Sequence, residues 1–214
     1  MQRLTDIQTL RRAGKVTIHR DDKTDRINST VIFRTPDHIR YLYETKGYTM
    51  TAGSNGDDIW RRIEITHGAT QYSRLDGLDR ILIEIDLMTL KPFSDSLWRE
   101  GALALLPAGS DDSDAPYVIE RRSGRYVDKM TINAGHFLCT QRDISFKSAE
   151  AEGPNSVTVE YGDYRYVDEI PMPFLVTTSV DATLSNTTQV SEIVVNPGVL
   201  SYVFGSTRAT ASYR

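Results

Sequence analysis

The residue types that most often carry chemistry are few in this chain of 214 residues and are spread along it. Metal sites and general bases usually need ligands or partners at a short, regular spacing. The four histidines show neither an HExxH nor a His-x-His spacing, and they lie in separate segments, at His19, His38, His67 and His136. They are interpreted as exposed or hydrogen-bonded strand residues.

The acidic residues offer two further candidates for chemistry. Asp111, Asp112 and Asp114 form a short acidic run, but it lacks the glycine and the distal glutamate of an EF-hand calcium loop. Asp57 and Asp58 could act as paired carboxylates, yet an ordinary hairpin turn at that point explains them as well. No GxSxG, P-loop or GxGxxG motif is present. The sequence therefore predicts no enzyme, no cofactor and no metal site.

Cys139 is the only cysteine, so the chain has no internal disulfide and no CxxC metal knuckle. Its neighbours Phe137 and Leu138 favour a buried thiol in a strand over a reactive one. A chain with one cysteine fits the cytosol and the periplasm equally.

Composition excludes several classes of protein. With 39% hydrophobic and 25% charged residues, the chain can bury a full core without disulfides or metal. A formal net charge of −4 with no basic stripe argues against nucleic acid as a partner. No run of about 18 apolar residues occurs, so no transmembrane segment is expected.

Short runs of alternating apolar and polar residues predict antiparallel strands joined by turns. They occur at residues 16–18, 31–33, 39–43, 59–65, 117–119, 126–132, 137–139, 157–161, 174–180 and 190–195. Their spacing is typical of a meander of about ten strands.

Residues 75–106 break this rhythm and predict a helical insert. Leu78, Ile81, Leu82 and Ile85 have the spacing of an apolar helix face, and a second helix is expected beyond Pro92. The first residues, 6–12, are predicted to end an N-terminal helix, and residues 205–214 to form a polar tail. No linker divides the chain, so we expect one α+β domain over residues 1–214.

The stretch VIFRTPDHIRYLY, residues 31–43, is interrupted by Pro36. It is either two strands joined by a turn or one strand that bends sharply, and a bend or bulge at residues 35–37 is expected, with Ile39, Tyr41 and Tyr43 on one face. A large antiparallel sheet must curl, so the predicted architecture is an incomplete barrel. The helices of residues 75–106 should cover its concave apolar face, leaving an apolar chamber of roughly 300 Å³ or more.

These features resemble the bacterial outer-membrane lipoprotein carrier and sorting proteins, the LolA/LolB-like family. The resemblance covers residues 7–204 and is carried by the segments IQTLRRAGKVTI, VIFRTPDHIRYLY, TAGSNGDDIWRRI, YVIERRSGRYVDKMTINAGHFLC, YGDYRYVDEIPMPFLVTTSV and SEIVVNPGVLSYVF. Two positions depart from the family pattern. Arg34 stands one residue further from Pro36 than the family's basic residue, and Glu169 replaces the glycine of a VDGI turn, so that turn is expected to differ.

The resemblance implies a non-enzymatic periplasmic carrier that shelters the acyl chains of a lipid or a lipidated protein, with its signal peptide removed. It implies a polar gate at Arg34. The expected cavity wall comprises Phe33, Tyr41, Trp60, Ile81, Ile85, Met88, Phe93 and Trp98, although ordinary core packing explains these residues equally well. The alternative is an interaction or envelope-sensing module of the same fold, with a filled core and a protein partner.

Overall fold

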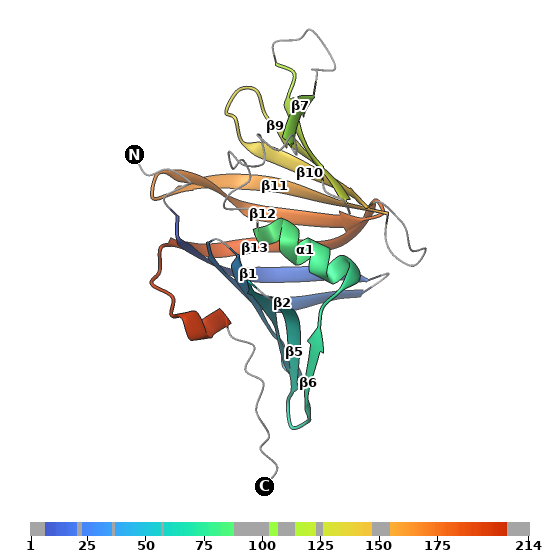
Figure 1. The fold of residues 1–214 in the computed structure, drawn as a ribbon, viewed down its shortest axis with the longest axis vertical. Helices are drawn as coiled ribbons and strands as arrows, with labels where there is room; N and C mark the ends of the chain where they lie inside the picture. The colour runs from blue at the N-terminus through green and yellow to red at the C-terminus, as the bar shows by residue number, and fades with distance from the viewer. Residues whose placement is uncertain are drawn as a thin grey trace.

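In the computed structural model, thirteen strands form one antiparallel sheet (Figure 1). The structure describes residues 7–20, 23–35, 37–56, 58–87, 103–106, 114–122, 126–146 and 155–204. The elements in the first half of the chain are β1 (Thr9–Arg20), β2 (Lys23–Arg34), β3 (His38–Glu44), β4 (Tyr48–Asn55), β5 (Ile59–Ile65), β6 (Thr70–Arg74) and α1 (Gly77–Leu87). Those in the second half are β7 (Leu103–Leu106), β8 (Tyr117–Arg122), β9 (Tyr126–Ile132), β10 (Cys139–Phe146), β11 (Ser156–Val167), β12 (Ile170–Val180), β13 (Thr183–Val195) and the 3-10 turn η3 (Ser201–Phe204).

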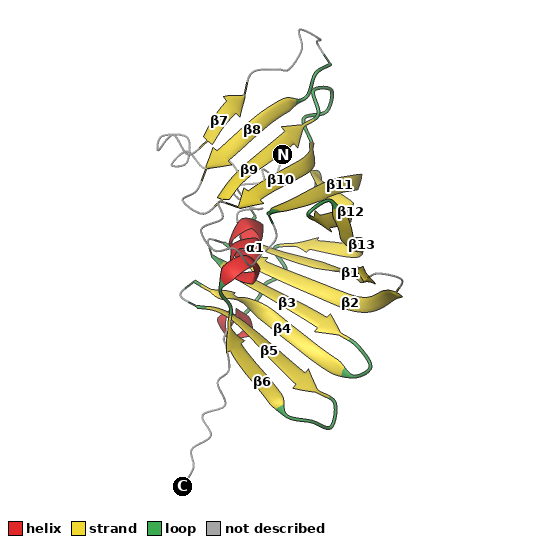
Figure 2. Ribbon diagram, turned by 90° about the vertical axis from the view of Figure 1, so that its right-hand side faces the viewer, coloured by secondary structure: helices red, strands yellow, loops and turns green. Residues whose placement is uncertain are grey.

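The strand order is β6-β5-β4-β3-β2-β1-β13-β12-β11-β10-β9-β8-β7. Strands β1 to β6 form one meander and β7 to β13 a second, and the two meet where β1 pairs with β13. The edge strands β6 and β7 lie at opposite ends of the sheet (Figure 2). The sheet is therefore curved but open.

The prediction of an α+β fold of about ten strands, with helices covering the concave face, is wrong. The described chain is nearly all antiparallel sheet, with thirteen strands. One helix of 11 residues, α1, packs against the sheet near β3, and it does not make a layer. Pairing between strands, not a helical cover, is what organises most of the chain, because strand follows strand through short turns.

Two helical predictions also need correction. Thr9–Arg12, expected to end a helix, belongs to β1, where Arg11 and Arg12 pair with Val194 and Ile193 of β13. The predicted insert of residues 75–106 yields α1, as its apolar spacing indicated, but Leu103–Leu106 at its end is strand β7. The second helix expected after Pro92 lies outside the described residues.

The interrupted stretch at residues 31–43 is a hairpin of two strands and not one bent strand. β2 ends at Arg34 and β3 begins at His38, and these two residues pair directly. Pro36 itself lies outside the described residues. Ile39, Tyr41 and Tyr43 share one face, as predicted, because Ile39 and Tyr41 are buried in the main core and Tyr43 packs against it.

The bend or bulge was expected at Pro36, whereas the structure has bulges in other strands. Between Ala13 and Gly14 the register of β1 against β13 shifts, and Ser191 is the extra residue on β13. A side chain at Gly14 would collide with the backbone of Gln189, so only glycine permits this close approach. Because a bulge bends its strand and increases the local twist, this one curves the sheet where its two halves join.

Two-residue turns close the long hairpins on either side of β12. Asp168 and Glu169, between β11 and β12, both have positive φ, 48° and 64°. Hairpin turns of type I′ require this backbone at both central residues. Glu169, at which the turn was expected to differ, therefore has a left-handed backbone. A residue with a Cβ thus occupies a position that suits glycine.

Glu169→Gly is expected to raise the free energy of unfolding by about 1 kcal/mol, because glycine carries no penalty at positive φ. Glu160→Gly, the same change at an exposed position within β11, should lower it by roughly 0.5–1 kcal/mol. Urea denaturation monitored by circular dichroism measures both. A destabilised Glu169→Gly variant would contradict the left-handed turn.

Candidate functional site

A partly open cavity of about 320 Å³ lies between α1 and the face of the sheet that this helix contacts. Its wall draws on β1 to β5, α1, and β10 to β13, so both halves of the sheet contribute. Apart from the tyrosines Tyr41, Tyr43 and Tyr161, the apolar wall residues are Leu10, Phe33, Met50, Ala52, Leu75, Leu82, Ile83, Ile144, Val157, Val159, Met172, Pro173, Val176 and Ile193. This volume lies near the lower end of the range for ligand pockets.

The structure places the predicted wall residues in different surroundings. Phe33 and Tyr41 line the cavity. Trp60 is buried but points away from it, because its neighbour Arg61 lines the wall and successive strand residues face opposite sides. The side chains of Ile81, Ile85, Met88, Phe93 and Trp98 lie outside the described residues. Ligand binding by any of these residues stays a prediction.

Arg34, predicted as a gate, lies on the face opposite the cavity. Its neighbour Phe33 lines the wall, whereas the Arg34 guanidinium sits 4.8 Å from the centre of the Phe204 ring. Phe204 is fully buried, and Arg40 donates a hydrogen bond of 2.8 Å to the carbonyl of Val203. These arginines therefore attach η3 to the back of the sheet.

A hydrogen bond attaches α1 to the sheet across the cavity. The Tyr41 hydroxyl donates to the Asp86 carboxylate, and the Tyr43 ring stacks on that of Tyr41 with centroids 6.1 Å apart. Burial raises the pKa of Tyr41 well above its ordinary value and the pKa of Tyr43 to about 12. The negative charge of Asp86 is the second cause for both tyrosines. Both hydroxyls stay protonated at neutral pH, so Tyr41 acts as the donor.

The cavity wall is more polar than the sequence predicted. Arg12 lies close enough to Tyr41 and Tyr43 to lower the pKa of both against the effect of Asp86. Arg61 Nη1 lies 3.5 Å from Asp79 Oδ2. Asp79 thus has a basic wall residue beside it, and Asp86 and Arg12 act on the same two tyrosines.

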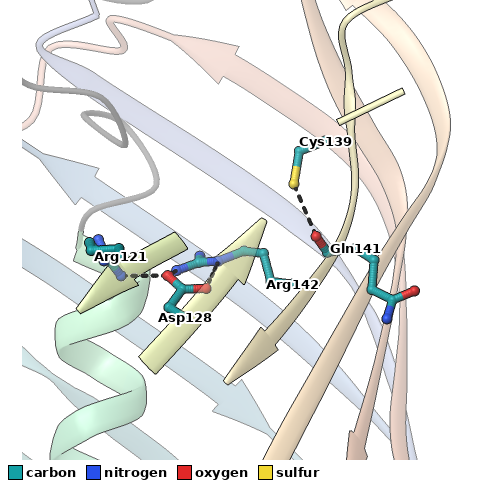
Figure 3. Close-up of polar contacts among 5 residues, drawn as sticks. All are labelled: Arg121, Asp128, Cys139, Gln141 and Arg142. Carbon is teal, nitrogen blue, oxygen red and sulfur yellow. Dashed lines mark hydrogen bonds and ion pairs between the residues drawn. The ribbon is translucent and has the colours of Figure 1, made fainter. Parts of the chain in front are cut away.

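A third basic wall residue, Arg142, belongs to a buried triad. Its Nη2 lies 2.6 Å from Asp128 Oδ2, and its Nε donates to Asp128 Oδ1 at 3.2 Å. Arg121 Nη2 donates to the same Oδ2 at 2.7 Å. The exposed fractions of Arg121, Asp128 and Arg142 are 3%, 0% and 6%. Figure 3 shows the two guanidinium groups converging on the one carboxylate.

Tyr161 extends this triad along the wall. Arg142 donates a hydrogen bond to its phenolic oxygen. Burial raises the pKa of Tyr161, although Arg142 acts against it. Burial lowers the pKa of Arg142, but Tyr161 and Asp128 more than offset this, and the pKa rises overall. The guanidinium is therefore charged and the phenol neutral at neutral pH.

Sequence reasoning missed the triad because it considered basic residues only as a possible surface stripe and found none. The signal was in the alternation of β9, where Asp128 stands between Tyr126 and Met130 in the inward series. A carboxylate in such a series must find a buried partner. The pairing of β9 with β8 and β10 determines which arginines become the partners of Asp128.

Asp128→Asn should lower the free energy of unfolding by roughly 3–5 kcal/mol, because it removes the charged carboxylate that both buried guanidinium groups contact. Asp163→Asn removes an exposed carboxylate that pairs with Arg165 at 2.6 Å and should cost far less, because water screens this pair. Thermal or urea unfolding measures both. Equal costs for the two changes would contradict the buried triad.

Cys139 lies at the start of β10, half-buried, and its thiol donates to the carbonyl of Gln141 at 3.5 Å. Burial raises the pKa of this thiol to about 11, although Arg142 acts to lower it. The thiol is therefore neutral at physiological pH, which agrees with the structural role expected from the sequence. Within the described ranges, no cluster of three or more His, Cys, Asp or Glu residues could hold a metal ion.

Alkylation of Cys139 by iodoacetamide is expected to be slow near neutral pH and to accelerate as the pH rises toward about 11, because only the thiolate reacts. The neutral thiol is the form that the fold favours, so its contribution to stability is complete below the ordinary thiol pKa and is lost as the pH rises through the folded value. Mass spectrometry follows a single adduct, and urea-unfolded protein is the control. Equal rates in both states near neutral pH would contradict the burial.

Comparison with known proteins identifies the fold but no sequence family. No protein-family model and no curated protein matches the sequence. Among the helices that the structure describes, none has the length and apolar character needed to cross a membrane.

Solved structures match most of the chain. A domain from Vibrio parahaemolyticus, provisionally named an outer membrane lipoprotein-sorting protein, has a TM-score of 0.60 and 10% identity over 92% of this chain and 89% of that one. A DUF1329 family protein from Desulfovibrio piger has a TM-score of 0.67 and 11% identity, covering 95% and 92%. A LolA superfamily protein from Nitrosomonas europaea has a TM-score of 0.65 and 14% identity, covering 92% and 90%.

At this level of identity the likeness concerns the backbone, and it covers 92–95% of this chain. The curved antiparallel sheet of this chain, with one helix against its face, has the LolA-like fold found in lipoprotein-sorting domains.

Proposed function

We propose that this protein is a non-enzymatic carrier of the bacterial periplasm that shelters an acyl chain of a lipid or of a lipidated protein. The observation that carries this proposal is the cavity of about 320 Å³ between α1 and the sheet. The LolA-like fold supports it, because one structural neighbour is named for the sorting of outer membrane lipoproteins.

The wall has the character that such a ligand needs. A continuous apolar surface runs from Leu10 and Phe33 through Ile83 of α1 to Met172 and Ile193. Each CH₂ group moved from water to such a surface contributes about 0.8 kcal/mol, so a single chain of ordinary length binds without any covalent chemistry.

The contacts of α1 support a gated cavity. Its Ile83 is buried in the main core, while its hydrogen bond to Tyr41 spans the cavity. Displacing the helix would break these contacts and widen the entrance of the cavity. The alternative, an interaction module of the same fold, needs a filled core, and the cavity favours the carrier over it.

Wild-type protein should bind a pyrene-labelled fatty acid saturably, and native mass spectrometry of protein purified from bacteria should detect a bound lipid. Ile83→Trp should weaken binding at least about tenfold, because the indole occupies space in the cavity. Ile65→Trp is the matched control, since Ile65 is 43% exposed and absent from the wall.

Circular dichroism establishes that both variants are folded. The carrier proposal fails if wild-type protein shows no saturable binding, or if the two tryptophan variants bind the probe equally well.

A further inference from the structure

Three uncharged polar residues belong to the cavity wall. Thr178 of β12 and Asn186 and Thr188 of β13 line the cavity, and each is half-buried. Among the described residues, none forms a hydrogen bond with these three side chains. Their hydroxyl and amide groups are therefore open to a ligand in the cavity.

Strand pairing brings the three residues together in one patch. Thr178 pairs directly with Asn186, and Thr188 pairs with Val176, which also lines the cavity. Directly paired residues share a face of the sheet, and so do residues two apart along a strand. Neighbours at such positions lie roughly 5–7 Å apart, so one small head group can reach all three side chains.

The patch interrupts two inward-facing series that are otherwise apolar. In β12, Thr178 follows the inward residues Ile170, Met172, Phe174 and Val176. In β13, Val190 is buried in the main core, whereas the inward residues before it are Thr188 and Asn186. The two strands therefore place neutral polar groups beside a long apolar surface.

A bare alkyl chain does not suit this patch. A chain lying across it would remove water from two hydroxyl groups and one amide without replacing their hydrogen bonds, which costs free energy. A threonine hydroxyl both donates and accepts, and the asparagine side chain has two N–H donors and a carbonyl acceptor. A ligand group that has a carbonyl together with a hydroxyl or N–H group would satisfy them.

The patch is also separate from the charged part of the wall. The charged residues among the described wall residues belong to β1, β5, β10 and α1, and none belongs to β12 or β13. On β1, Ile18 pairs with Asn186, and Arg12 lies six residues away, or roughly 20 Å along the strand. Arg142 of β10 is two strands from Thr178, and its guanidinium contacts Asp128. The hydrogen-bonding groups of the patch therefore suit an uncharged head.

We propose that Thr178, Asn186 and Thr188 form a subsite for an uncharged head group, so that the ligand is an acyl chain joined through an ester or amide carbonyl to a hydroxyl-bearing group. The chain lies on the apolar wall, and the carbonyl and hydroxyl exchange hydrogen bonds with the patch. This inference rests on the proposed function and specifies its ligand.

The test uses four ligands with the same chain length. Monododecanoylglycerol carries the ester, N-(2-hydroxyethyl)dodecanamide the amide and dodecanoate a charged head, while dodecyl methyl ether has neither a carbonyl nor a donor. Each is titrated against protein loaded with the neutral dye Nile red, at about pH 8, where dodecanoate is ionised. The change in affinity between wild-type protein and a variant is measured for every ligand, which cancels the differences in solubility between ligands.

The double variant Thr178→Val, Thr188→Val removes both hydroxyl groups and keeps the β-branched shape that suits a strand. It should weaken the ester, the amide or both by about tenfold or more and leave the ether within about threefold. Asn186→Leu, of similar size, should act in the same way.

The matched control is Thr177→Val, Thr187→Val. These two threonines are also half-buried and pair with each other, one residue away from the patch on the opposite face of the sheet. The control should leave the affinity for all four ligands within about threefold of wild type. Circular dichroism establishes that each variant is folded.

The outcomes separate the two proposals. If Thr178→Val, Thr188→Val and Asn186→Leu both leave the ester and the amide unchanged, or if dodecanoate alone is weakened, the subsite proposal is wrong and the carrier proposal stands. The subsite proposal is also wrong if the ether is weakened as much as the ester and the amide. If none of the four ligands displaces the dye, both proposals fail.

Discussion

The pairing of β1 with β13 is the contact on which the rest of the structure depends. It joins strands from opposite ends of the chain, from Leu10 with Val195 to Ile18 with Asn186, and it is the link between the two meanders. Asn196 reinforces it, since its side-chain oxygen accepts from the backbone N–H groups of Gln8 and Thr9. Closing so long a loop is entropically costly, so this register forms only with the core around it.

The cavity follows from that pairing. Its wall takes Phe33 and Tyr41 from the first meander and Val157 and Met172 from the second. Neither half of the sheet could form it alone. The bulge at Ser191 lies within the joining pair, and the resulting curvature gives the sheet a concave face against which α1 packs (Figure 2).

The charges in the cavity have different roles according to their partners. Asp79 and Asp86 belong to α1 and meet groups from β3 and β5, so they position the helix. Arg142 shares its carboxylate with Arg121. The contacts of the first kind thus fasten α1 to the sheet, and those of the second kind join β8, β9 and β10 behind the cavity wall.

The sequence by itself determined the local elements. Period-two alternation identified most strands, the turn residues identified most hairpins, and the apolar spacing at residues 78–85 identified α1, because these patterns reflect only neighbouring residues. Resemblance of the successive motifs also indicated the LolA-like fold. The first residues of β1, 9–12, were mistaken for part of a helix, since their extended form depends on partners far along the chain.

Only the tertiary structure decided which side chains meet. Phe33 and Trp60 are both aromatic residues of predicted strands. The register of the strands turns Phe33 into the cavity and Trp60 away from it. The polar half of the wall was not foreseen, because Arg142, Tyr161 and Asp128 come together across neighbouring strands. Burial of a charged residue depends on what covers it, and that is a property of the assembled sheet.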